Sequence, residues 1–203
     1  PSTDTNGTFI IPLENGQQPE MECKDTVMSV KSVIFPQTEK ILVSSLDETV
    51  ENHHIQERAE NDYTPRAVIG IRPFDAKAVE LVKMNFITDD YTDPYWKDAY
   101  EATTFIGLGV TTPGASDFST STGTGPFDET GLDVLLADMD DHYLAKVLTD
   151  KGRTYMDACG FTSETDATEG QVLLDILKKE AEKNIRSAIK TDKLKEKTIL
   201  ELH

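Results

Sequence analysis

The chain has 203 residues, of which 37% are hydrophobic and 28% are charged, values that are ordinary for one globular domain. Its 37 acidic residues outnumber its 20 basic residues, so the formal net charge is −17. A field of this sign repels phosphate backbones and anionic lipid headgroups, which makes nucleic acid and membrane surfaces poor partners. No apolar run is long enough for a transmembrane helix and no signal peptide is visible, so we expect no membrane insertion.

Two cysteines, Cys23 and Cys159, are too few for a disulfide framework or a four-thiolate metal site. We expect both to be isolated, buried thiols that pack as small apolar side chains. This use of cysteine favours a reducing compartment, so we expect a cytoplasmic protein.

The first 27 residues are polar and punctuated by glycine and proline, and we expect the folded domain to cover residues 28–203. Short strands are predicted at residues 30–34 and 40–43, where apolar side chains recur between polar ones. Residues 47–65 form an acidic connection with little structural preference.

Residues 67–71 form the clearest buried strand, a short apolar run without alternation. A helix is predicted to begin near Asp75, whose carboxylate is a good N-cap. A second buried strand is predicted at residues 103–109, and residues 132–148 are typical of a hairpin. We expect the two buried strands to be adjacent in one sheet, with the helix on one face and the hairpin extending the sheet.

From about Glu169 the spacing of the apolar residues changes to the spacing that is typical of a long helix, which we expect at the C-terminal end. The side chains expected to face inward are those of Val172, Leu173, Ile176, Leu177, Ala181, Ile185 and Ala188. The predicted fold class is therefore α/β, with a single mixed-sheet domain, flanking helices, a β-hairpin and a long C-terminal helix.

The most unusual stretch is GVTTPGASDFSTSTGTGP, residues 109–126. Consecutive small residues can direct backbone N–H groups at an anion, and the candidate ligand-binding residues are Thr120, Ser121, Gly123, Thr124 and Gly125. The stretch lacks the Gly-Lys-Ser/Thr ending of a phosphate-binding loop and the Gly-x-Gly-x-x-Gly of a dinucleotide site. An ordered connecting loop is the simpler interpretation.

Arg72 and Asp75 flank the turn between the first buried strand and its helix, and they could also hold an anionic ligand. Capping of the helix is the simpler interpretation for Asp75. No Gly-x-Ser-x-Gly elbow appears in the sequence, so no residue is assigned a catalytic role.

Two stretches together resemble the amino-terminal domain of a family of iron–sulfur electron-transfer subunits. They are Arg72-Pro-Phe-Asp75 with the helix that follows, and the loop from Val110 through Pro126. The family includes an electron-transfer subunit of anaerobic sulfite reductase and the beta subunit of cytoplasmic sulfhydrogenases. The resemblance extends to VIFPQTEKIL near the start and covers roughly residues 28–160.

The resemblance implies four cluster-ligand positions, which are occupied here by Phe74, Val110, Asp117 and Ser119. Phenylalanine and valine cannot ligate a metal, and one Asp with one Ser is a poor ligand set for iron–sulfur chemistry. We therefore interpret the four positions as vestigial and expect no metal or cofactor in this chain. We also expect Phe74 and Val110 to pack against each other in the space that the metal would occupy.

Two functions follow from the resemblance and its departures. The first is a non-catalytic assembly or docking module of a hydrogenase-like or sulfite-reductase-like electron-transfer complex, with other subunits as partners. In that case any [4Fe–4S] clusters are expected in a C-terminal ferredoxin-like domain absent from this chain. The second is a ligand-binding or regulatory domain that uses loop 110–126 for an anion or nucleotide. We expect the chain to have no activity of its own and to be at most a subunit of an oxidoreductase complex.

Overall fold

The computed structural model of the chain describes residues 2–4, 7–18, 26, 29–51, 53–160, 166–186 and 188–189. The chain divides into two compact units, Pro1–Glu39 and Lys40–His203. In the first unit β1 (Ser2–Asp4) pairs with β2 (Gly7–Phe9) in antiparallel fashion. The strand predicted at residues 30–34 is wrong: the Ser29 hydroxyl accepts a hydrogen bond from the Lys31 N–H and caps a 3₁₀ turn at Val30–Val33.

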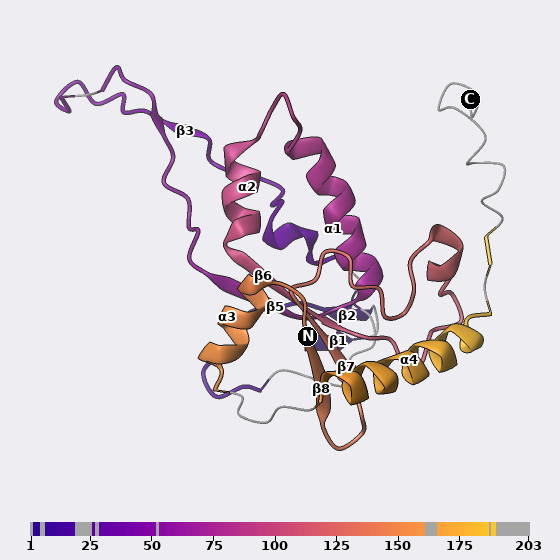
Figure 1. Ribbon diagram of the computed structural model, residues 1–203. Helices are drawn as coiled ribbons and strands as arrows, with labels where there is room; N and C mark the ends of the chain where they lie inside the picture. The colour runs from indigo at the N-terminus through magenta and orange to yellow at the C-terminus, as the bar shows by residue number, and fades with distance from the viewer. Residues whose placement is uncertain are drawn as a thin grey trace, which may run out of the picture. The chain divides into compact units, whose positions relative to one another are not determined.

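The second unit is built on a four-stranded mixed sheet with the strand order β5-β6-β7-β8 (Figure 1). Its first three strands, β5 (Arg66–Ile71), β6 (Thr103–Leu108) and β7 (Val134–Asp138), are parallel. The last strand, β8 (Tyr143–Val147), is antiparallel to β7. This confirms the predicted α/β fold, with β5 and β6 adjacent and the hairpin extending the sheet. The prediction that residues 67–71 form a buried strand is wrong: β5 lies at the edge of the four-stranded sheet, where Ile69 is 60% exposed and only Ile71 is buried, whereas β6 is buried as expected.

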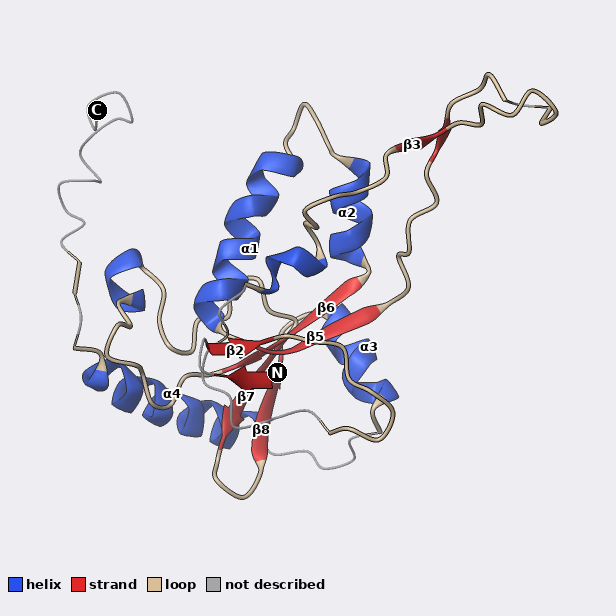
Figure 2. Ribbon diagram, turned by 180° about the vertical axis from the view of Figure 1, so that it is seen from behind, coloured by secondary structure: helices blue, strands red, loops and turns tan. Residues whose placement is uncertain are grey.

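Two helices connect β5 to β6, namely α1 (Pro73–Phe86) and α2 (Pro94–Glu101), and they lie on one side of the sheet (Figures 1 and 2). The predicted N-cap is wrong, because Arg72 is the N-cap of α1 and Asp75 lies in its first turn. Pro73 explains the earlier start: its fixed φ suits the first helical position, where a missing N–H costs nothing.

An aromatic column joins α1, α2 and β6. The ring of Trp96 stacks on Phe86 at 5.6 Å and on Tyr100 at 5.0 Å between centroids. Tyr100 in turn contacts Phe105 of β6 at 5.8 Å. Burial, and then the hydrogen bond to Glu80, raises the pKa of the Tyr100 hydroxyl well above its ordinary value, so Tyr100 stays protonated. Each aromatic pair contributes about 0.5–1.5 kcal/mol beyond its buried area, so the column fixes both helices against the sheet.

Two further helices follow the sheet, α3 (Asp150–Ala158) and the expected long helix α4 (Ala167–Asn184). The predicted inner face of α4 is partly wrong. Leu174 and Ala181 are buried, whereas Val172 and Ile176 are 53% and 55% exposed. Ala188 is exposed as well, because the helix ends at Asn184. The helix has two neighbouring apolar rows, and the row that contains Gly170 and Leu174 packs toward β8. None of the helices in the described part of the chain combines the length and apolar character that a membrane span requires.

Asp133 joins β6, β7 and α3 at the start of β7. Its buried carboxylate accepts hydrogen bonds from the Phe105 N–H at 2.8 Å and the Thr149 hydroxyl at 2.6 Å. It also forms an ion pair with Lys151 at 3.2 Å between Nζ and Oδ2. Its backbone carbonyl accepts from the Leu148 N–H at 2.9 Å. One buried side chain therefore satisfies polar groups of β6 and of the start of α3, next to the first residue of β7.

We expect Asp133→Ala to lower the free energy of unfolding by about 3 kcal/mol, because it leaves the buried Phe105 N–H without an acceptor and Lys151 without its charge partner. Urea denaturation followed by circular dichroism measures the change. Asp90→Ala is the matched control, since Asp90 is exposed and its side chain bonds to no described residue. A loss below about 1 kcal/mol in Asp133→Ala would show that Asp133 is dispensable.

Candidate functional site

The candidate site residues follow two adjacent parallel strands. Parallel strands place their carboxyl ends at the same edge of a sheet, which is where open α/β sheets bind ligands. Arg72, Phe74 and Asp75 follow β5 at the start of α1, and Val110 follows β6. Phe74 and Val110 are both partly buried. Their direct packing against each other stays a prediction.

The loop after β6, residues 109–133, is the crossover connection between the parallel strands β6 and β7. Such a connection needs about a dozen residues or more and usually contains a helix. Here its one helical element is a 3₁₀ turn at Ser119–Thr122. The loop returns along β6. The buried side chain of Phe127 fills the space that a Cβ at Gly109 would need, and that of Leu132 fills the corresponding space at Gly107. At these two positions, therefore, glycine has a packing role.

Hydrogen bonds inside the loop occupy many of its donors. The Ser119 N–H donates to the Asp117 carboxylate at 2.8 Å, and the Thr124 N–H and hydroxyl both donate to the Ser119 carbonyl. The N–H of Gly123 donates to the Thr120 carbonyl, and its φ of 76° ends the 3₁₀ turn in a conformation that favours glycine. An anion would have to displace these bonds, so the loop is closed on itself.

Ser121 and Gly125 face the C-terminal part of the second unit. The Ser121 hydroxyl accepts a hydrogen bond from the Ile189 N–H at 3.1 Å. A Cβ placed at Gly125 would lie 3.3 Å from a carboxylate oxygen of Glu182 on α4. A carboxylate so close to the loop repels an anion, which weakens the case for a phosphate or nucleotide at this position.

Among the described residues, the Ser119 hydroxyl is one of three buried side-chain polar groups without a hydrogen-bond partner, the others being Arg66 Nε and Trp96 Nε1. Ser119 is 6% exposed, and its Oγ makes no hydrogen bond to any described residue. Leaving a hydroxyl unpaired inside a protein costs free energy, whereas a thiol in the same place behaves as a small apolar group.

No three His, Cys, Asp or Glu side chains in the described ranges lie close enough together to hold a metal ion. The expectation of a buried thiol is wrong for Cys159, which is exposed because it caps the C-terminal end of α3. Cys23 lies outside the described residues.

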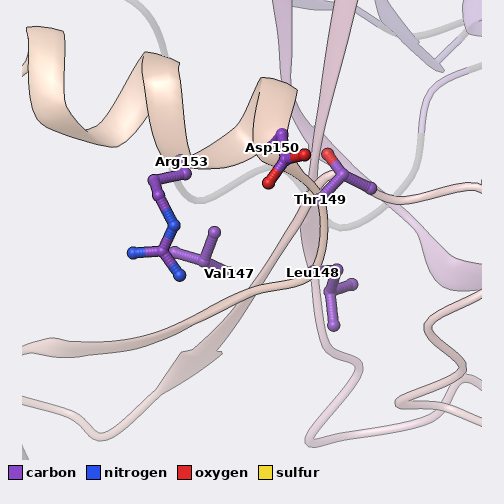
Figure 3. Close-up of a pocket in the computed structure, with 5 residues that line it drawn as sticks. All are labelled: Val147, Leu148, Thr149, Asp150 and Arg153. Atoms are coloured by element: carbon purple, nitrogen blue, oxygen red, sulfur yellow. The ribbon is translucent and has the colours of Figure 1, made fainter.

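A shallow depression of about 380 Å³ lies where β8 meets α3 (Figure 3). Arg153 extends from α3 alongside Val147, while Asp150 and Thr149 mark the start of the helix (Figure 3). The fifth lining residue is Leu148. One cation and one carboxylate on an open surface provide no nucleophile and no metal ligand set, so the depression does not indicate catalysis.

The least covered part of the second unit is the arm, which we define as residues 40–59. Its base is the antiparallel pair β3 (Leu42–Val43) and β4 (Glu57–Arg58), and the chain between them extends away from α2 in both views (Figures 1 and 2). The base is anchored on α2. The Tyr95 hydroxyl donates to the Ile41 carbonyl at 2.6 Å, and Arg58 pairs with Asp98 at 2.7 Å.

Large apolar side chains are exposed along the arm. Their exposed fractions range from 44% to 95%, and the residues are Ile41, Leu42, Val43, Leu46, Val50 and Ile55. Acidic residues lie between them, and the Thr49 hydroxyl and N–H donate to the Asp47 carboxylate. These two hydrogen bonds lower the pKa of Asp47, so its charge persists below the usual titration range of aspartate.

No protein-family model, curated protein or solved structure matches the chain.

We expect Ser119→Ala to leave the free energy of unfolding unchanged or to raise it slightly, because alanine removes an unpaired buried hydroxyl. Thr124→Val is the matched comparison. It should lose about 1 kcal/mol, since the buried Thr124 hydroxyl donates to the Ser119 carbonyl. Urea denaturation measures both. An equal loss in Ser119→Ala would mean that the Ser119 hydroxyl has a bound partner.

Proposed function

We propose that the chain is a non-catalytic docking module of a cytoplasmic electron-transfer complex and that it contacts partner subunits through the arm. The observation that carries the proposal is the row of exposed apolar side chains on a segment whose base is anchored. Burial of apolar surface stabilises by about 25 cal/mol per Å², so a clustered exposed row is a contact surface that lacks its partner.

The electron-transfer part of the proposal rests on the resemblance to iron–sulfur subunits. Two features of the candidate site support it. Phe74 and Val110 are partly buried at the sheet edge where the resemblance implies two cluster ligands. The Ser119 hydroxyl is buried and bonds to no described residue, which is what replacement of a buried cysteine by serine would leave behind. Both features agree with a scaffold of this family in which the residues at the ligand positions provide no soft ligand.

The second function, a ligand-binding or regulatory domain that uses loop 110–126, has less support. Several loop donors are occupied internally, and Glu182 lies beside Gly125. The loop also has a sufficient structural reason to exist, since it connects two parallel strands. Docking through the arm requires no rearrangement of these contacts.

The test is to express the tagged full chain in its native host and to measure the iron and acid-labile sulfide that co-purify with it. We expect Leu46→Ser to lower this recovery about tenfold, because a deeply inserted apolar side chain at an interface is commonly worth about 1.4 kcal/mol or more. Met84→Ser is the matched control: Met84 is a 68% exposed apolar side chain on α1, away from the arm.

Equal recovery with the wild-type chain and Leu46→Ser would contradict docking through the arm. Recovery of a complex without iron or sulfide, still dependent on Leu46, would contradict only the electron-transfer assignment.

A further inference from the structure

Between the residues that anchor the arm on α2, every Asp, Glu, Lys or Arg side chain is acidic. From Ile41 to Glu57 the sequence contains Asp47, Glu48, Glu51 and Glu57 but no Lys or Arg. The acids alternate with the apolar residues, so that Asp47 and Glu48 follow Leu46 directly and Glu51 follows Val50. An apolar strip with an acidic border is complementary to an apolar groove with a basic border.

We propose that the arm inserts into an apolar groove of a different protein, and that Lys and Arg side chains border this groove. The proposal rests on the docking function above and specifies the chemistry of the partner. Apolar contacts of Leu46 and its neighbours supply most of the affinity, because they are desolvated at the centre of the contact. The acids at the border set partner choice and the rate of association.

A second copy of the chain fits this surface less well than a basic partner does. Each copy carries a net charge of −17, so two copies repel each other, most strongly at low ionic strength. The exposed apolar residues of α4 have charges of both signs beside them, because Val172 and Ile176 lie in a segment that contains Asp175 and Glu180 as well as Lys178 and Lys179. Such a mixed border is less complementary to the acidic arm than a border of Lys and Arg alone.

The carboxylates of Glu48 and Glu51 are suited to a test because neither bonds to another described residue. Their replacement by glutamine removes charge without removing a structural hydrogen bond. The same change at Asp89 and Asp90, two exposed acids between α1 and α2, provides a control of equal charge.

The experiment places a photo-reactive amino acid at position 46 of the full chain in its native host and identifies the cross-linked peptide by mass spectrometry. The same residue at position 84 is the control. We expect a peptide from another protein that contains apolar residues next to Lys or Arg. We also expect the cross-link yield to fall at least threefold in Glu48→Gln/Glu51→Gln and to stay unchanged in Asp89→Asn/Asp90→Asn.

The outcomes separate this proposal from the docking function itself. Two outcomes would contradict the basic border of the groove but leave docking through the arm intact. In the first, the peptide cross-linked to position 46 comes from another protein but has no Lys or Arg beside its apolar residues. In the second, the cross-link yield does not change in Glu48→Gln/Glu51→Gln. A peptide from this chain, including its basic residues 183–197, would overturn the different-protein partner. A yield at position 46 no higher than at position 84 would overturn docking through the arm altogether.

Discussion

The carboxylate of Asp133 is the interaction on which the arrangement of the second unit depends. It accepts from β6 and α3 at the point where β7 begins, and Gly152 approaches so closely that an added Cβ would lie 2.2 Å from the Asp133 carbonyl oxygen. Lys151 both pairs with this carboxylate and lies 5.2 Å from the ring of Tyr100. The polar contacts at Asp133 and the aromatic column therefore stabilise each other through Lys151.

This constraint explains the crossover loop. The connection from β6 must pass over the sheet and arrive at Asp133 in register, and it does so without an α-helix. Close packing replaces the helix. Leu132 covers Gly107 of β6 and Phe127 covers Gly109 just after it, while Gly131, at a φ of 80°, lies against the Ala76 carbonyl of α1. A composition that resembles a ligand cradle is thus also what a compact crossover needs, and the contact surface that we propose is the arm instead.

The positions of β5, β6 and the hairpin could be predicted because their apolar runs are bounded by turn residues. The exposure of β5 could not, since its place at the edge of the sheet follows only from the strand order. The contacts of Asp133 could not, since they depend on the register between strands far apart in the sequence. The face of α4 was ambiguous because Val172 and Leu174 are equally apolar, and only packing on β8 selects one of them. The arm could not be predicted from the sequence, because Leu42 and Val43 are typical of a buried strand. In the structure they pair with Glu57–Arg58 and remain exposed.

The central claim is that the arm, rather than loop 110–126, is the functional surface. Amide hydrogen exchange of the full chain, measured free and in the complex purified from its host, tests it most directly. Contact through the arm predicts slower exchange at residues 41–55 in the complex and unchanged exchange at residues 110–126. Slower exchange confined to residues 110–126, with the arm unaffected, would contradict the claim.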